Sequence, residues 1–335
     1  MNILTKYVKF LRIPGLGGLA IPPVIGALTV NPNIDLFYLI LLFLIGSLAA
    51  IYGFVLNDYV DIEVDKLSNE LKGRPLVSGE ISQKKAVGIC IFCVFFAFLL
   101  IFILFYGKVI EGYIFAAVIS ISLALILGSI YDFHSKDFIG SDFLVAISVS
   151  LVFLFGALSI GEPTLFTWII FILTFNNLLH MNAIEGGIKD AEHDKKYGVK
   201  NIALKSGVIV SNKNIIIPKK FKALSFGIRL FSSLLIFIPF LFYGISFYPW
   251  QIIILFIAIF IMLYLNLKLL TIKEFNRNII KKYISSLSFV RYSLIPIMLI
   301  STIGIIYSTI LIIIPIGWYI IFAPLSGEKL LKPIM

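Results

Sequence analysis

Aspartates recur at helical spacing in the stretch NDYVDIEVDKLSNELKGRPLVSG, which occupies residues 57–79. Asp58, Asp61 and Asp65 are separated by three and four residues, so a helix would bring all three carboxylates to one face, with Asn57 one turn before Asp61. Carboxylates this close repel each other unless a cation lies among them, and oxygen ligands suit Mg²⁺. The spacing favours a magnesium site, although an acidic, solvated helix end would carry the same residues.

Basic residues follow these aspartates directly. Lys72 and Arg74 belong to the sequence KGRP, and their side chains are of the kind that binds phosphate oxygens. The stretch therefore predicts a metal and a phosphate ester bound close together.

A second acidic pair lies in GGIKDAEHDKKYGVKN, where Asp190 and Asp194 are one helical turn apart. Two carboxylate groups of this kind could hold two divalent ions with a diphosphate bridging them, and the metals would then neutralise a departing pyrophosphate. Lys189 and Lys200 are near enough in the sequence to help bind phosphate. Lys136, in YDFHSKDFIGS, could also reach a phosphate or could simply occupy an ordinary turn.

The composition indicates that these groups are positioned by membrane helices. Of the 335 residues 60% are hydrophobic and only 14% charged, and the mean hydropathy is +1.03. No ordinary soluble domain is this apolar, so lipid must cover most of the surface. The net charge of +10 could suggest nucleic acid, but the Lys and Arg residues stand between apolar segments. That pattern is typical of membrane topology, so no nucleic-acid partner is expected.

Nine apolar segments are each long enough to cross a hydrocarbon core of about 30 Å. They are 14–30, 36–56, 86–106, 110–131, 142–160, 164–184, 223–243, 248–270 and 288–306. A shorter segment, 309–323, contains Pro315 and could be a tenth span or a re-entrant piece. We predict an all-α polytopic membrane bundle forming a single domain over 1–335, with a core at about 10–306 and a C-terminal extension at 307–335.

The charges of the connecting loops indicate orientation. With the N-terminus inside, the loops on that side carry nearly all of the loop Lys and Arg residues, whereas the opposite loops contribute only Lys108. Positive loops are retained in the cytoplasm. We therefore predict a multi-pass protein of the cell membrane with its acidic motifs on the cytoplasmic side.

The sequence allows two roles for several other polar residues. Asn176, Asn177, His180 and Asn182 are unusual inside an apolar segment, and they could either hydrogen-bond between helices or line a cavity. His193 is close to the second acidic pair but lacks the spacing of a metal ligand.

Three elements together resemble the signatures of the UbiA-type intramembrane prenyltransferases. Asn57-Asp58-x-x-Asp61-x-x-x-Asp65 with the later Arg-Pro-Leu-Val-Ser-Gly is similar to their first motif, and Lys189-Asp190-x-x-x-Asp194 to their second. Tyr131, Lys136 and Gly140 are similar to the family's tyrosine–lysine–glycine element. The order and spacing of these elements cover the chain from about residue 10 to residue 306.

The resemblance implies a nine-helix bundle around a central cavity, dependence on Mg²⁺, and transfer of a prenyl group from its diphosphate to an acceptor. The resemblance also implies which residues bind the metals: Asn57, Asp58, Asp61, Asp190 and Asp194. The residues next in line around the diphosphate are Asp65, Arg74, Lys136 and Lys189, with Lys72, Tyr131 and Lys200 as further candidates.

The chain departs from many relatives at Gly187, where they carry an additional Asp three residues before the first acid of the second motif. An acid at position 187 would share a helical face with Asp190 and Asp194, so Gly187→Asp is expected to strengthen metal binding and to be neutral or mildly favourable for the helix. Glu185 is nearby, but two residues of helix turn it to another face.

We therefore predict Mg²⁺-dependent prenyl transfer within the membrane. The donor is an allylic prenyl diphosphate, and the acceptor is either an aromatic quinone precursor or a prenylated glycerol phosphate. An ion-coupled transporter is the alternative, since it could also use clustered carboxylates. A transporter needs polar groups near the middle of the membrane, whereas these acids cluster at one end of the predicted spans.

Overall fold

The computed structural model describes residues 3–66, 71–109 and 111–326, and these residues form helices joined by loops and one short β-hairpin. The predicted all-α class is thereby confirmed. The part of the expected C-terminal extension beyond residue 326 lies outside the described residues. The chain forms two compact units, one made of residues 1–133, 148–167 and 314–330 and the other of residues 134–147, 168–313 and 331–335.

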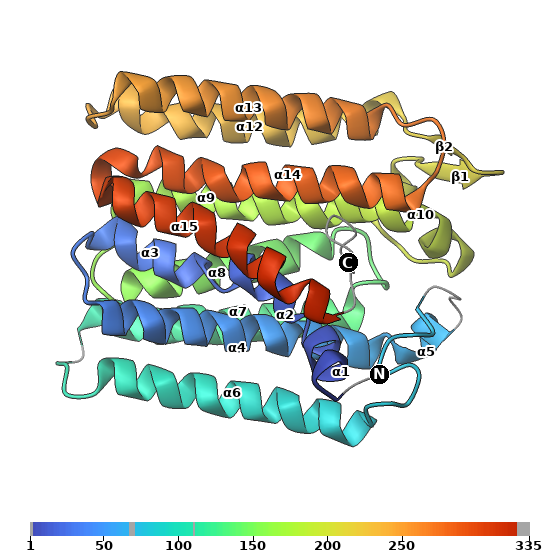
Figure 1. Ribbon diagram of the computed structural model, residues 1–335, viewed down its shortest axis with the longest axis horizontal. Helices are drawn as coiled ribbons and strands as arrows, with labels where there is room; N and C mark the ends of the chain where they lie inside the picture. The colour runs from blue at the N-terminus through green and yellow to red at the C-terminus, as the bar shows by residue number, and fades with distance from the viewer. Residues whose placement is uncertain (1–2, 67–70, 110, 327–335) are drawn as a thin grey trace. The chain divides into compact units, whose positions relative to one another are not determined.

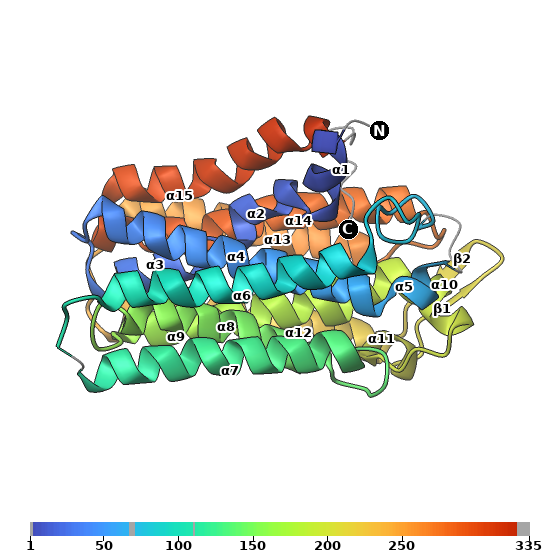
Figure 2. The ribbon, with the colours of Figure 1, turned by 90° about the horizontal axis from the view of Figure 1, so that it is seen from below.

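The first unit is built around long apolar helices preceded by three short ones. Its elements are α1 (Ile3–Phe10), α2 (Ile13–Leu19), α3 (Pro22–Val30), α4 (Leu36–Val60), α5 (Ile62–Lys66), α6 (Gln83–Phe105) and nearly all of α7 (Gly112–His134). Asp35 begins α4 by accepting a hydrogen bond from the Phe37 backbone N–H. Helix α4 packs along α6, and the two lie side by side in both ribbon views (Figures 1 and 2).

The second unit carries most of the remaining elements. Helices α8 (Asp142–Leu158), α9 (Leu165–Leu179) and α15 (Ile300–Phe322) contribute residues to both units. The other elements are the π-helix η1 (His180–Gly186), α10 (Gly187–Lys196), α11 (Ile202–Lys205), β1 (Ile209–Ser211), β2 (Asn214–Ile216), α12 (Lys219–Phe242), α13 (Pro249–Leu270) and α14 (Arg277–Met298). A 3-10 turn, η2 (Pro324–Ser326), follows α15. Helix α13 packs against both α12 and α14 (Figure 1).

A hairpin links α11 to α12. Ile209 pairs with Ile216 and Val210 with Ile215, and the two turn residues, Asn212 and Lys213, both have positive φ. Two consecutive residues with positive φ are the mark of a tight hairpin turn whose twist matches that of its strands. The hairpin is also tied to the loop before α14, because the Ile215 N–H donates to the Lys273 carbonyl (2.9 Å).

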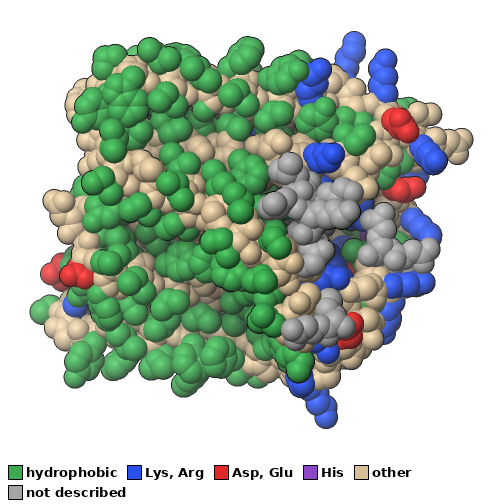
Figure 3. Space-filling model, in the orientation of Figure 1, with side chains coloured by type: hydrophobic (Ala, Val, Ile, Leu, Met, Phe, Trp, Pro, Cys, Tyr) green, Lys and Arg blue, Asp and Glu red, His purple; other side chains and the backbone are tan. Residues whose placement is uncertain are grey.

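Within the described residues, eight helical stretches are long and apolar enough to cross a membrane, and α8 is a shorter apolar helix. Figure 3 shows one face of the molecule, on which hydrophobic side chains cover much of the surface. The bounds of the last two segments differ from the sequence prediction. Residues 288–306 do not form one span, because α14 ends at Met298 and α15 begins at Ile300. Residues 309–323 lie almost wholly within α15, which is one of the eight.

Candidate functional site

The first acidic motif lies where α4 ends. The expected uninterrupted helix through Asp65 is broken at Asp61, which follows the last residue of α4 with φ −83° and ψ 0°. The hydrogen-bond pattern nevertheless continues, since the Asp61 N–H donates to the Asn57 carbonyl (3.0 Å) and the Asp65 N–H to the Asp61 carbonyl (2.8 Å). The helical order of the carboxylates is thus kept through the break.

Arg74 lies between two of these carboxylates. Its Nη1 is 3.1 Å from Oδ1 of Asp58 and 2.5 Å from Oδ2 of Asp65, and both aspartates are buried. Burial lowers the pKa of Arg74, but the carboxylates of Asp58, Asp65 and Asp61 outweigh that effect and raise it above its ordinary value. The cation that this acidic cluster requires is therefore supplied by the chain itself.

Arg12 is a second cation at Asp58. Its Nη2 lies 2.5 Å from Oδ1 of Asp58, and its guanidinium stands over the ring of Phe54 at 5.0 Å from the centroid. Arg12 has a left-handed backbone, with φ 48°, at the junction between α1 and α2. The sequence analysis did not place Arg12 in the site, because a pair 46 residues apart leaves no local signal.

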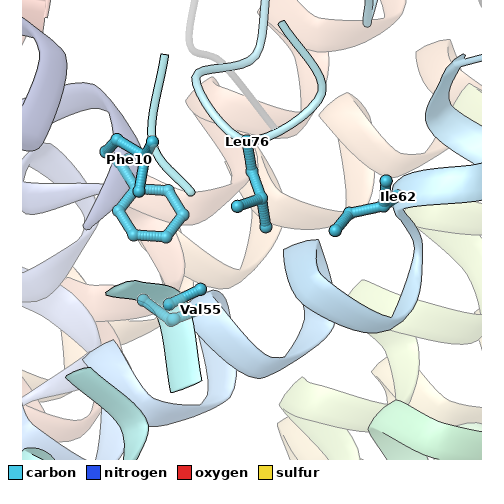
Figure 4. Close-up of a cluster of buried hydrophobic side chains, with 6 residues drawn as sticks. Phe10, Val55, Ile62 and Leu76 are labelled. Atoms are coloured by element: carbon cyan, nitrogen blue, oxygen red, sulfur yellow. The ribbon is translucent and has the colours of Figure 1, made fainter. Parts of the chain in front are cut away.

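A cluster of apolar side chains holds the motif loop against these helices. Phe10 of α1, Val55 of α4, Ile62 of α5 and Leu76 of the loop come together (Figure 4), and each is at most 5% exposed. Because Leu76 is anchored two residues after Arg74, the loop backbone that carries the guanidinium is fixed. Lys72 of the same loop is exposed.

Asp132 is a further carboxylate that the sequence analysis missed. It is 5% exposed, takes a side-chain hydrogen bond from Asn57, and interacts electrostatically with Asp61, Asp58 and Arg12. A signal was present, because Asp132 is an ionisable residue at the end of an apolar segment and directly follows the half-buried Tyr131. Such residues are costly to retain near membrane depth and usually have a function.

The second acidic motif is on α10 in the other unit. Asp190 is bound by Arg277 of α14, whose Nη2 lies 2.6 Å from Oδ1, and by Lys189, whose Nζ lies 3.3 Å from Oδ2. Asp194 accepts a hydrogen bond from Asn201 Nδ2 (2.7 Å). Arg277 was also absent from the sequence prediction, since 87 residues separate it from Asp190.

Two of the predicted phosphate-binding lysines belong to neighbouring loops of this unit. The Lys200 N–H donates to the Lys136 carbonyl (3.1 Å), and the charges of Lys136 and Lys189 both act on Asp194. The Lys200 side chain is exposed. Lys136, Lys189, Asp190, Asp194 and Lys200 therefore gather at the end of α10.

Gly187 lies at a close contact between two helices. It is buried, and a Cβ added there would lie 2.6 Å from Cβ of Ala203 in α11. An acid at position 187 would crowd Ala203, because the glycine allows α10 and α11 to pack closely; its expected effect on metal binding stays a prediction.

The polar residues of α9 and η1 hydrogen-bond between helices. Asn177 Oδ1 accepts from Arg229 of α12 (3.1 Å), and His180 Nε2 is 2.8 Å from Ser225 Oγ of the same helix. Asn182 instead donates to the Leu178 carbonyl within its own helix (2.9 Å). For Asn177 and His180 the interhelical alternative is confirmed.

The donor atoms of the two motifs fit a hard divalent cation. In the part of the chain that the structure describes, no group of three or more His, Cys, Asp or Glu side chains is placed to hold a metal alone. Mg²⁺ commonly binds one or two carboxylates together with substrate phosphates. The pair Asp190 and Asp194, and the acids around Asp58, provide oxygen ligands of this type.

Comparison with known proteins gives a family and a fold. The model of the UbiA prenyltransferase family matches residues 19–287. Digeranylgeranylglyceryl phosphate synthase of Saccharolobus solfataricus is 30% identical over 218 residues, which cover 61% of this chain and 70% of that protein. 4-Hydroxybenzoate octaprenyltransferase of Vesicomyosocius okutanii is 28% identical over 172 residues, covering 50% of this chain and 58% of that protein.

A solved structure shares the fold. The UbiA homolog from Archaeoglobus fulgidus, bound to GPP and Mg²⁺, aligns with a TM-score of 0.62 at 21% identity, covering 89% of this chain and 99% of that chain.

Proposed function

The chain belongs to the UbiA prenyltransferase family, and from this premise we propose that it transfers a prenyl group from an allylic prenyl diphosphate to the hydroxyl of a prenylated glycerol phosphate. It is a multi-pass membrane protein and a prenyltransferase. Family membership favours the transferase over the ion-coupled transporter. The proposed location is the cell membrane, with the acidic motifs on the cytoplasmic side.

The observation that carries the proposal is that both acidic motifs have their carboxylates bound by arginine: Asp58 and Asp65 by Arg74, and Asp190 by Arg277. Adjacent carboxylates and guanidiniums are the groups that bind a metal diphosphate. The relative solved with GPP and Mg²⁺ supports the same ligands for this chain.

The proposed roles follow from these contacts. The residues proposed to bind Mg²⁺ are Asn57, Asp58, Asp61, Asp190 and Asp194. The residues proposed to surround the diphosphate are Asp65, Lys72, Arg74, Tyr131, Lys136, Lys189 and Lys200, to which the contacts add Arg12, Asp132 and Arg277. Mg²⁺, when bound, supplies charge stabilisation for the departing diphosphate.

The basic side chains have two successive tasks in this proposal. Before substrate binds, Arg74 and Arg277 neutralise the carboxylates and keep them correctly oriented. When the diphosphate enters, the guanidiniums transfer to phosphate oxygens, because a planar fork of N–H donors fits those oxygens as well as it fits a carboxylate. The oxygens of these aspartates would then be available to hold Mg²⁺. The prenyl chain stays among apolar helices.

The acceptor is inferred from the relatives. The 30% identity with a digeranylgeranylglyceryl phosphate synthase supports a prenylated glycerol phosphate. The likeness to a 4-hydroxybenzoate octaprenyltransferase supports an aromatic quinone precursor as the second candidate.

The test is a turnover assay on purified protein in detergent or liposomes. A radiolabelled prenyl diphosphate is supplied with Mg²⁺ and either geranylgeranylglyceryl phosphate or 4-hydroxybenzoate, and both pyrophosphate release and labelled product are measured. Product formed only with the glycerol phosphate supports the proposal, and product formed only with the aromatic acid replaces it by the second candidate. Full activity in the presence of a chelator would refute the metal-dependent mechanism.

A further inference from the structure

A cluster of charged side chains that belongs to neither acidic motif is buried in the second unit. Glu185 and His180 of η1 are 0% exposed, Arg229 of α12 is 1% exposed and Arg291 of α14 is 5% exposed. Ionisable groups at such depth in a membrane protein are costly and usually functional. The sequence motifs give this cluster no role.

Glu185 joins three helical elements through this cluster. Its Oε1 accepts from Arg229 Nη2 (2.8 Å), and its Oε2 accepts from Arg291 Nη2 (2.9 Å). His180 Nδ1 lies 3.1 Å from Oε1 of Glu185, and the other ring nitrogen, Nε2, lies 2.8 Å from Oγ of Ser225. Both carboxylate oxygens of Glu185 therefore have hydrogen-bond partners, and these bonds connect η1 to both α12 and α14.

The segment held in this way is a π-helix that leads directly into α10. A π turn contains one more residue than an α turn, and such turns are frequent at functional sites. Since an α-helix advances about 100° per residue, one extra residue turns everything after it by about 100° about the helix axis. The state of η1 therefore decides in which direction α10 presents Asp190 and Asp194.

Two other contacts fix α10 in the same orientation. Arg277 at the start of α14 binds Asp190, while Arg291 farther along the same helix binds Glu185. Gly187 rests against Ala203 of α11 at a distance that leaves no room for a side chain. A rotation of α10 would break the first contact and lose the close packing of the second.

We propose that Glu185, bound by Arg229 and Arg291, is a positioning residue that holds η1 in its π form and so directs Asp190 and Asp194 toward Mg²⁺ and diphosphate. The proposal rests on the proposed function. A buried ion pair is commonly no more stabilising than apolar residues of the same volume. The ion cluster instead defines one geometry, because Oε1 of Glu185 accepts from both Arg229 and Arg291 while Oε2 accepts from Arg291.

The test compares Glu185→Gln with Glu192→Gln. Glutamine keeps the size of Glu185 and removes its charge. Glu192 lies on α10, directly after η1, and is exposed, so Glu192→Gln is the matched control. Three quantities are measured: the thermal midpoint in detergent, Mn²⁺ binding by electron paramagnetic resonance with inorganic pyrophosphate present, and kcat and KM for the prenyl diphosphate.

For Glu185→Gln we expect folded protein that needs about fivefold or more Mn²⁺ for half-saturation, with kcat lowered by about tenfold or more. Glu192→Gln should match the wild type in all three quantities. A lower thermal midpoint with unchanged Mn²⁺ binding and unchanged kcat would overturn the proposal, because a merely structural role predicts that result. If Glu185→Gln does not fold, Arg291→Lys, which keeps the charge and loses the fork, is judged by the same criteria.

Failure of the proposed function gives a different result. In that case the wild type itself binds no Mn²⁺ with pyrophosphate and releases no pyrophosphate from the donor, and both proposals fall. If the wild type does both and Glu185→Gln equals it, only the positioning role is refuted.

Discussion

The packing at Gly187 allows a quantitative prediction. A Cβ at this position would lie 2.6 Å from Cβ of Ala203, whereas ordinary contact starts at 3.4 Å. Overpacking of this kind costs about 1–3 kcal/mol, and the replacement of Gly by Ala within a helix returns about 0.5–1 kcal/mol. We expect Gly187→Ala to lower the free energy of unfolding by up to about 2.5 kcal/mol. Gly187→Asp adds the same atom and a charge, so it should be worse.

Ala203→Gly provides the decisive partner substitution, because it removes the atom that a Cβ at position 187 would meet. The two substitutions together should show a coupling energy of about 1–3 kcal/mol in a double-mutant cycle. Gly53→Ala in α4, where an added Cβ has nothing within 4 Å, is the control and should be neutral or stabilising. Unfolding is followed by circular dichroism during titration with sodium dodecyl sulfate in mixed micelles. Additive effects of the two substitutions would refute the reasoning.

Three further predictions concern charge. Asp190→Ala should lower kcat by about a hundredfold or more, whereas Glu192→Ala should leave it unchanged; similar losses in both would show that α10 as a whole is only structural. Arg74→Met removes the cation between two buried carboxylates, so the free energy of unfolding should fall by about 3–5 kcal/mol at neutral pH, and a fall below 1 kcal/mol would contradict this. A cysteine replacing Lys200 should be shielded from an impermeant thiol reagent in intact cells while one replacing Glu162 reacts, and the opposite labelling would reverse the proposed orientation.

The sequence predicts most of the fold because membrane spans are long apolar segments bounded by charged loops, and the structure has helices at nearly all of the predicted positions. The exception is α14. Its first half carries polar and charged residues such as Arg277, so hydropathy places the start of a span too late. A helix that binds its neighbours through side-chain charges does not have the composition of one that faces lipid on most sides.

The site was only partly predictable for a related reason. The motif residues are close in sequence, so spacing predicts that Asp58, Asp61 and Asp65 lie together. Arg12 and Arg277 bind carboxylates that are far from them in the sequence, and no local sequence pattern predicts such pairs. Glu185 was expected to lie on another helical face than position 187, and the π turn that contains it could not be read from a repeat of 3.6 residues. The roles of the site residues, and the single-domain organisation, stay predictions.

The contact between Arg12 and Asp58 has a consequence for the synthesis of the protein. Arg12 leaves the ribosome well before Asp58, because 46 residues separate the two. Under the proposed orientation, its charge would during that interval act together with Lys6 and Lys9 to favour a cytoplasmic location of the first residues. Once α4 is inserted, the same guanidinium is bound by the acidic motif. A substitution such as Arg12→Gln would therefore act twice, first on the direction of insertion and later on the finished site, and reconstitution of purified protein separates the two effects.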